Sequence, residues 1–288
     1  MVYGTDFASD CLTVKAWNEV MVAAPLIGGK AAYPAAIDAT RRLHEAGCRL
    51  FIISNSSRRS GNTLKKLEPM GYDPEWFSGV VTSGEITHQR LSRRGGGGGG
   101  GKEEAGDGGG AGVAGDDDVF ASLGDNCLHF TWGSRGAISL EGLGLTTVTD
   151  TKLADFILAH GTECVNGPGG ANSTDEERAE GAIVTPLDDM RAMLAEASKL
   201  RLPMVVANPD FVTVGGGSLL PMPGTLARWY SESLSAEGEE RSDLIQLMGK
   251  PAPIIYRRVM EMTGADGEET IAVGDSMEHD IAGAAGAG

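Results

Sequence analysis

The sequence predicts an α/β fold with a Rossmann-like core built on a parallel sheet. Two short apolar stretches, residues 48–53 and 79–84, are followed by helix-like segments at 60–70 and 85–93. A third such stretch, residues 271–273, lies near the end of the chain. This alternation is typical of a doubly wound parallel sheet, because each helix returns the chain across a face of the sheet.

The elements nearest the start are less regular. Residues 37–46 are predicted to form a helix that ends at Gly47, since glycine readily adopts the left-handed conformation after a last turn. Residues 20–27 are apolar, but Pro25 limits them to an edge strand or a short strand.

A second α/β unit is predicted in the middle of the chain. Its expected strands are residues 127–131, 145–148, 155–159 and 202–207, and its expected helix is residues 187–200. Residues 221–234 are expected to return the chain to the first unit, with a helix from about residue 225. The helix at 187–200 is amphipathic. Its apolar side, which is expected to face a core rather than a cofactor, carries Met190, Met193, Leu194, Ala197 and Leu200.

Two segments have the composition of loops. Residues 95–118 begin with an unbroken glycine run and bury too little apolar surface to offset their ordering entropy, so disorder is expected. A phosphate-cradling loop is the alternative, but no Gly-Lys-Ser/Thr ending supports it. Residues 166–181 are polar and are expected to form a surface loop.

Charge and cysteine content exclude several classes of protein. Lys and Arg number 24 and Asp and Glu number 40, a net charge of −16, which disfavours nucleic-acid binding. The four cysteines are widely spaced and indicate neither a disulfide framework nor a zinc site. No membrane span or signal peptide is recognised, so a cytoplasmic or organelle interior is expected.

The stretch with the most chemical content follows the apolar run at 271–273. Gly274 permits a sharp turn, and Asp275 and Asp280 follow at the expected carboxyl end of a strand. Two carboxylates there suit a hard cation such as Mg²⁺. The alternative is a helix N-terminus stabilised by acidic side chains.

Two upstream segments have a similar pattern, in which an apolar or turn stretch precedes a hydroxyl or a lysine: residues 51–59 contain Ser54, and residues 248–251 contain Lys250. Together with Asp275 and Asp280 they resemble the haloacid dehalogenase (HAD) superfamily. Ser54 matches the second motif of that superfamily, Lys250 the third, and Asp275 with Asp280 the fourth. The segments at residues 54–59, 207–210, 249–251 and 274–284 are similar to subclass IIA, which carries a large α/β cap. The resemblance implies a core from residues 1–90 and 218–288, with a cap from residues 91–217.

The resemblance also implies roles for these residues. Ser54 would donate to a phosphate oxygen, Lys250 would offset negative charge, and Asp275 would hold Mg²⁺ with Asp280 as a ligand or support. A turn hydroxyl, a solvated lysine and helix caps are the alternatives. Asn55, Asn208 and Asp210 are expected to bind substrate, with a simple turn as the alternative for the last two.

The implied activity is hydrolysis of a phosphate monoester, such as a sugar phosphate. A homodimer through the cap is expected by analogy. A dinucleotide-binding protein is disfavoured, because no Gly-x-Gly-x-x-Gly follows an early strand.

The nucleophilic Asp of the first motif is missing. Counting back from residues 33–37, which resemble the segment after that motif, places it near Met21, but no Asp occurs between Asp10 and Asp38. Asp6 and Asp10 come too early in the chain to match. The chain is therefore expected to be an impaired phosphatase relative, and a pseudoenzyme that binds a phosphorylated ligand or a protein partner is the alternative.

The ends of the chain bear on this expectation. The first 30 residues are unlike the family, and the chain stops soon after the fourth motif. A truncated or mis-spliced version of an active enzyme is the expectation that follows from both ends.

Overall fold

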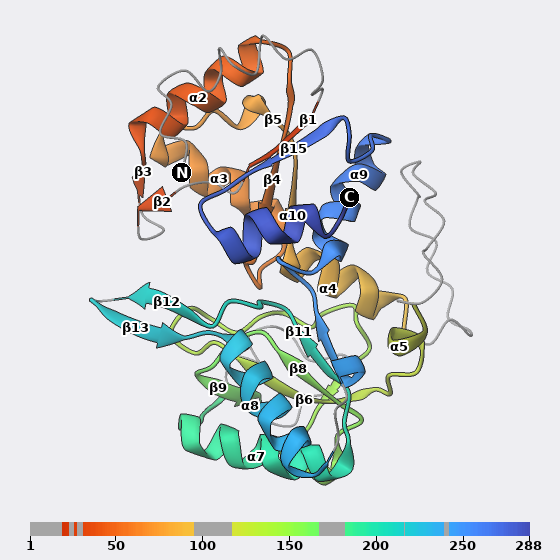
Figure 1. The fold of residues 1–288 in the computed structure, drawn as a ribbon. Helices are drawn as coiled ribbons and strands as arrows, with labels where there is room; N and C mark the ends of the chain where they lie inside the picture. Colours follow the sequence, from red (N-terminus) through yellow and green to blue (C-terminus); the bar gives the residue numbers. More distant parts are fainter. Residues whose placement is uncertain are drawn as a thin grey trace. The chain divides into compact units, whose positions relative to one another are not determined.

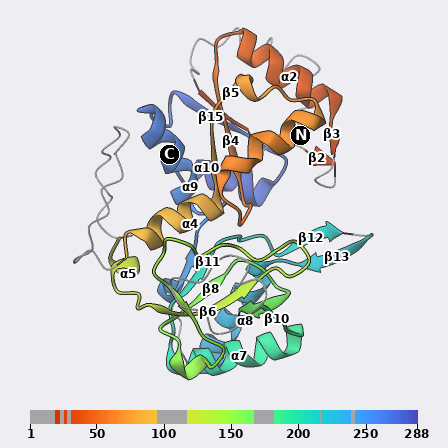
Figure 2. The same ribbon diagram turned by 180° about the vertical axis from the view of Figure 1, so that it is seen from behind.

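A computed structural model describes residues 19–22, 26–27, 31–94, 117–166, 182–215, 217–238 and 242–288. The chain divides into two units (Figures 1 and 2). Unit 1 contains Met1–Ser54, Arg59–Ser83 and Gly249–Gly288, and unit 2 contains Asn55–Arg58 and Gly84–Met248. Most of the glycine-rich segment and of the polar loop predicted at 166–181 lies outside the described residues.

Unit 1 contains a four-stranded parallel sheet. Its strands, in spatial order, are β15 (Thr270–Val273), β1 (Glu19–Val22), β4 (Arg49–Ser54) and β5 (Phe77–Thr82). β1 is an inner strand, with Met21 opposite Phe51 on one side and Ala272 on the other. For residues 20–27 an edge strand or a short strand was expected. The edge position is wrong for β1, because a strand pairs with it on each side, and the strand is short, ending at Val22 before the proline.

The other elements of unit 1 are short apart from two helices. α2 (Pro34–Glu45) and α9 (Pro253–Thr263) each begin with a proline. Proline is tolerated there because a backbone N–H in the first turn has no acceptor within the helix. The remaining elements are β2 (Leu26–Ile27), β3 (Ala31–Ala32), η1 (Ser60–Asn62), α3 (Thr63–Leu67), η2 (Glu68–Met70), η3 (Pro74–Trp76), the π-helical turn η6 (Met277–Ala282) and α10 (Gly283–Ala285).

The unit 1 core forms around β4. Leu50 and Ile52 of this strand are buried with side chains from neighbouring elements, namely Leu43, Leu67, Tyr72 and Phe77. The strand predicted at residues 48–53 is thus confirmed, and its last residue is Ser54.

Unit 2 contains a larger, mixed sheet. Its main path runs β10 (Ala182–Val184), β9 (Cys164–Asn166), β6 (Asn126–Thr131), β8 (Phe156–Ala159), β11 (Met204–Val206) and β14 (Ile245–Leu247), and β7 (Thr146–Thr147) also pairs with β6. The pairs from β6 through β8 and β11 to β14 are parallel. β9 pairs antiparallel with β6, and β10 pairs antiparallel with β9.

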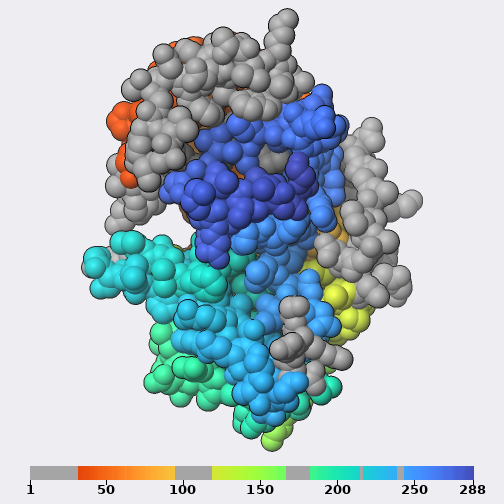
Figure 3. Space-filling model, viewed as in Figure 1, coloured from red at the N-terminus to blue at the C-terminus, as the bar shows by residue number. Residues whose placement is uncertain are grey.

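The remaining elements of unit 2 include its two long helices, α7 (Leu187–Leu200) and α8 (Pro223–Ala236), which contact each other. The others are α4 (Ser83–Ser92), α5 (Asp117–Ala121), η4 (Thr151–Leu153), η5 (Ser242–Leu244) and the hairpin of β12 (Val212–Gly215) with β13 (Ser218–Pro221). Figure 3 shows this hairpin at the surface of unit 2, where Val214 and Leu219 are exposed.

The division differs from the expected one, because residues 55–58, 84–90 and 218–248 lie in unit 2. Residues 218–248 stay there for two reasons. β14 extends the sheet by pairing with β11, and α8 buries Leu226, Tyr230 and Leu234 in the unit 2 core.

The apolar face of α7 was predicted correctly except at its end. Met190, Leu194 and Ala197 are buried, and Met193 packs against them. Leu200, however, is 47% exposed, because the helix ends there and Arg201 adopts a left-handed conformation.

None of the helices in the described parts of the chain is long and apolar enough to cross a membrane.

Candidate active site

The candidate site lies at the carboxyl edge of the unit 1 sheet. Val22, the last residue of β1, is in register with Ile52 of β4 and Val273 of β15. Ser54 closes β4, and Asp275 follows β15 by two residues. Because the three strands are parallel and adjacent, their last residues, Val22, Ser54 and Val273, lie at one edge of the sheet, and Asp275 follows there. The order of the strands can be followed in Figure 1. Open α/β sheets bind ligands at such an edge.

Asp275 and Asp280 lie in different environments. Asp275 is exposed, whereas Asp280 is only 3% exposed. Asp280 Oδ2 accepts a hydrogen bond of 3.0 Å from the Ser276 backbone N–H. A Cβ at position 274 would lie 2.2 Å from Asp280 Cγ, so only glycine fits at that turn.

Lys250 is the partner of the buried carboxylate. Its Nζ donates to Asp280 Oδ1 over 2.6 Å, and the lysine is 8% exposed. The alternative of a solvated surface lysine is therefore wrong. The structure brings the third and fourth motifs together as one buried ion pair.

Tyr256 of α9 contacts the turn that carries Asp280. Its hydroxyl donates to the backbone oxygen of His279 over 2.5 Å. Burial raises the pKa of Tyr256, and the charge of Asp280 raises it further, so the phenol stays protonated. A Cβ at position 283 would meet the Tyr256 hydroxyl at 2.6 Å, which explains a glycine at the start of α10.

Ser54 is half-buried at the end of β4. The Ser83 hydroxyl donates to the Ser54 backbone oxygen over 3.3 Å and fixes the peptide on its carboxyl side. The position agrees with the expected phosphate donor, and the role itself stays a prediction.

The three predicted substrate-binding residues lie together in unit 2. Asn55 Nδ2 donates to Asp210 Oδ1 over 2.8 Å, and Asn208 Oδ1 accepts from the Asp210 N–H over 2.9 Å. Asn55 and Asn208 are buried. All three side chains thus make local contacts, and their binding of a substrate stays a prediction.

Asp275 and Asp280 differ in how well they suit Mg²⁺. Within the described ranges, no group of three or more His, Cys, Asp or Glu side chains could hold a metal ion. Asp275 offers an exposed carboxylate, while both oxygens of Asp280 accept hydrogen bonds. Since Mg²⁺ usually keeps several waters and takes one or two carboxylates with substrate phosphates, Asp275 fits as its ligand and Asp280 fits as a support.

Sequence reasoning missed a second buried polar cluster, in unit 2. His129 Nε2 lies 2.9 Å from His160 Nδ1, and Asn166 Nδ2 lies 2.8 Å from His129 Nδ1. Burial lowers the pKa of His160 to about 3, with the charge of His88 adding to the effect. No local signal identifies this cluster, because its three residues come from separate strands or loops.

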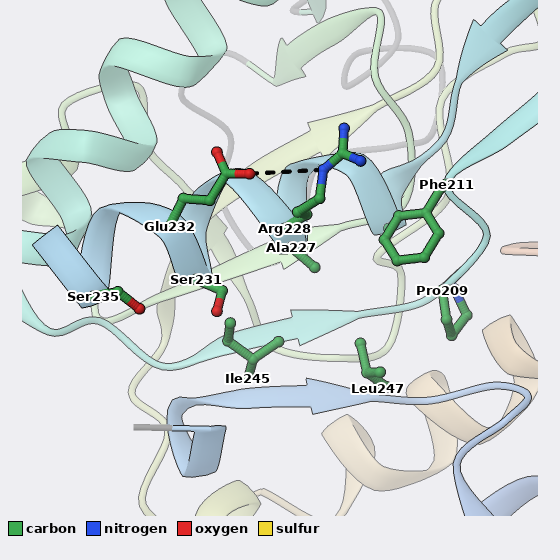
Figure 4. Close-up of a pocket in the computed structure, with 10 residues that line it drawn as sticks. Pro209, Phe211, Ala227, Arg228, Ser231, Glu232, Ser235, Ile245 and Leu247 are labelled. Atoms are coloured by element: carbon green, nitrogen blue, oxygen red, sulfur yellow. Dashed lines mark ion pairs between the residues drawn. The ribbon is translucent and has the colours of Figure 1, made fainter. Parts of the chain in front are cut away.

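A cavity of about 560 Å³ lies beside α8 in unit 2 (Figure 4). Pro209, Phe211, Ile245 and Leu247 give it an apolar lining, and Arg228 pairs with Glu232 over 3.9 Å. The guanidinium of Arg228 also lies over the Phe211 ring. None of the predicted site residues is among the described residues that line it.

The sequence matches two family profiles described as haloacid dehalogenase-like hydrolase. One covers residues 122–288 and the other covers residues 25–105. The chain therefore belongs to the haloacid dehalogenase-like hydrolases, as the four segments of the sequence suggested.

Solved structures with a similar fold belong to the same class. A haloacid dehalogenase-like hydrolase from Brucella suis 1330 is 22% identical, with a TM-score of 0.65 over 97% of this chain and 85% of that one. NagD from E. coli K-12 is 19% identical, with a TM-score of 0.55 over 96% and 86%. The p-nitrophenyl phosphatase from Archaeoglobus fulgidus is 17% identical, with a TM-score of 0.55 over 94% and 83%. No curated protein matches the sequence.

Proposed function

We propose that this chain is a relative of Mg²⁺-dependent phosphatases that act on a small phosphorylated metabolite, such as a sugar phosphate. The observation that carries the proposal is the arrangement of Ser54, the end of β1 and Asp275 along one edge of the sheet. The phosphatases among the structures of similar fold support the same reaction class.

In this proposal the site residues stabilise the negative charge of the phosphate group. The Ser54 hydroxyl donates to a phosphate oxygen, and Lys250 keeps a positive charge near that oxygen in a water-poor site. Asp280 holds the Lys250 ammonium in place through their 2.6 Å contact. Mg²⁺ bound at Asp275 would supply further neutralisation of the phosphate.

We propose further that turnover by this chain is impaired. The residues that follow β1 in the sequence are Ala23, Ala24 and Pro25, and the nucleophile is expected near Met21, where no carboxylate occurs. Without a carboxylate, the covalent route that divides hydrolysis into two easier steps is lost. Removal of a covalent nucleophile costs about 10⁶ in turnover in a well-studied hydrolase.

A non-catalytic role is the second candidate, favoured by the same three residues after β1. In that case the site would bind a phosphorylated ligand without hydrolysing it, or unit 2 would bind a protein partner, including a second copy of the chain. Phosphate binding without turnover would distinguish a ligand-binding site from an active one.

The test is Mg²⁺-dependent release of phosphate from p-nitrophenyl phosphate, with inorganic phosphate binding measured by calorimetry. The chain is compared with Asp275→Asn, and Glu278→Gln is the matched control because Glu278 is an exposed carboxylate of the same turn. We expect little turnover in all three and Mg²⁺-dependent binding that weakens about tenfold in Asp275→Asn alone. Full turnover in the unaltered chain would contradict the impairment, and absence of phosphate binding would contradict the site.

A further inference from the structure

The loop that follows Ser54 is tied to unit 2 by side chains. This tether loop, Asn55–Arg58, is part of unit 2, whereas Ser54 ends a strand of unit 1. Asn55 donates to Asp210, the Ser57 hydroxyl donates to the His160 backbone oxygen over 2.7 Å, and the Arg58 guanidinium donates to the backbone oxygens of Arg135 and Gly136. Three separate segments of unit 2 therefore bind three of the four residues of this loop.

The contact between Asn55 and Asp210 joins a buried amide to a charged acceptor. The acceptor is a carboxylate, and hydrogen bonds to charged groups are about twice as strong as neutral ones. Asn55 is 7% exposed, so water cannot readily replace the lost partner. The two residues are 155 positions apart in the sequence.

Asp210 is itself held in place by the backbone around it. Its N–H donates to Asn208 Oδ1, and its backbone oxygen accepts from the Gly224 N–H over 3.0 Å. A Cβ at position 224 would lie 2.0 Å from the Pro209 backbone oxygen, so α8 approaches this turn as closely as the backbone allows. The acceptor for Asn55 is therefore fixed.

A second close approach holds the tether loop from the other side. The Gly84 N–H donates to the Ser56 backbone oxygen over 2.9 Å, and a Cβ at position 84 would lie 2.0 Å from the Ser57 backbone oxygen. Within unit 1, the adjacent Ser83 hydroxyl binds the Ser54 backbone oxygen. The segments that follow β4 and β5 are thus joined by two hydrogen bonds. One lies within unit 1, between Ser83 and Ser54, and the other lies within unit 2, between Gly84 and Ser56.

We propose that Asp210 is a positioning residue for Ser54. By fixing Asn55, the next residue in the chain, it sets the backbone from which the Ser54 hydroxyl and the following N–H point. This assignment differs from substrate binding, and the charge of Asp210 agrees with the difference, since a carboxylate repels a phosphate group. The effect on phosphate rests on the function proposed above, whereas the effect on the Ser54 backbone does not.

The test uses an exchange of the two side chains in the full chain. Asn55→Asp places two carboxylates together and breaks the contact, Asp210→Asn keeps a weaker neutral hydrogen bond, and the double exchange restores one donor and one carboxylate. Asp189→Asn, at an exposed position of α7, is the matched control. Amide hydrogen exchange at residues 54–58 and the affinity for inorganic phosphate with Mg²⁺ are measured for each.

We expect Asn55→Asp to speed exchange at Ser54 and the tether loop about tenfold or more. It should weaken phosphate binding by a similar factor. The double variant, Asn55→Asp with Asp210→Asn, should recover most of the protection from hydrogen exchange and most of the phosphate affinity. Asp210→Asn should show a smaller change and keeps the test valid if Asn55→Asp does not fold.

Unchanged exchange at Ser54 in both single variants would overturn the proposal, whatever the phosphate result. Faster exchange with unchanged phosphate affinity would show that the contact is only structural and would also overturn it. If the unaltered chain binds no phosphate, a change in Ser54 exchange that the double variant reverses supports the positioning role and contradicts only the proposed function.

Discussion

The two units bury polar side chains in opposite ways. In unit 1, Lys250 and Asp280 are buried as a charged pair with Nζ and Oδ1 2.6 Å apart. In unit 2, His129 and His160 are buried side by side with 2.9 Å between Nε2 and Nδ1, and the low pKa of His160 keeps that ring neutral at pH 7. The first cluster lies at the candidate site, and the second lies on β6 and directly after β8 in unit 2.

The two clusters differ in the free energy that burial costs, and the difference indicates which of them is explained by function and which by packing. Taking two charges out of water costs several kcal/mol per ion, and a buried pair of apolar residues is often as stable. A charged pair at the edge of a sheet is therefore better explained by the need for a fixed ammonium group. The neutral His160 ring carries no such cost, and His129 and His160 join β6 to the end of β8 by hydrogen bonds.

The largest effect is expected from breaking the charged pair. Asp280→Asn leaves the Lys250 ammonium buried without its counter-charge, and we expect the free energy of unfolding to fall by about 3–5 kcal/mol. Urea unfolding at pH 7, followed by a signal from unit 1, measures this change. Asp275→Asn is the control, because the exposed Asp275 should change the same quantity by less than about 0.5 kcal/mol. Equal effects in both variants would contradict the contrast between the two carboxylates.

A smaller effect is expected from the neutral cluster, and it depends on pH. The ordinary pKa of His160 is 6.5, and burial lowers it to about 3 in the folded chain. Below pH 6.5 the unfolded chain binds a proton that the folded chain does not, so stability is lost as the pH falls from 6.5 toward about 3. The loss from this one group is about 1.4 kcal/mol per pH unit.

The control for that prediction is His160→Gln, which cannot titrate. Since carboxylates also contribute to the slope, the difference between the unaltered chain and the variant is the quantity to measure. Chemical unfolding at several pH values between about 4 and 7 gives the slope of the unfolding free energy against pH. In the variant this slope should correspond to about one proton fewer taken up on unfolding. Parallel slopes would mean that His160 takes up its proton in the folded chain near its ordinary pKa.

The local parts of the fold and site could be predicted from the sequence. Ser54 and Asp275 follow apolar runs that became β4 and β15, and their place at a common edge follows once the strands are parallel. α7 was predicted with its full length because its apolar period is clear. In each of these cases the signal lies within one segment.

Contacts between distant segments could not be predicted in this way. Asp280 was expected near a metal, but its position beside Lys250 depends on how α9 and η6 pack. β14 belongs to unit 2 only because β11 offers it an open edge, and nothing in residues 245–247 encodes that partner. The bond between Asn55 and Asp210 is equally invisible before the chain folds.

The central proposal is that the edge of the unit 1 sheet is a phosphatase site without its nucleophilic carboxylate. The most direct measurement restores carboxylates at the end of β1, through Met21→Asp with Ala23→Asp, and follows Mg²⁺-dependent hydrolysis of p-nitrophenyl phosphate. We predict that the restored chain gains at least about a hundredfold in turnover, a fraction of the ~10⁶ that a nucleophile can contribute. The gain should disappear when Asp275→Asn is added. A folded variant with no gain, or an unaltered chain that is already as active, would contradict the claim.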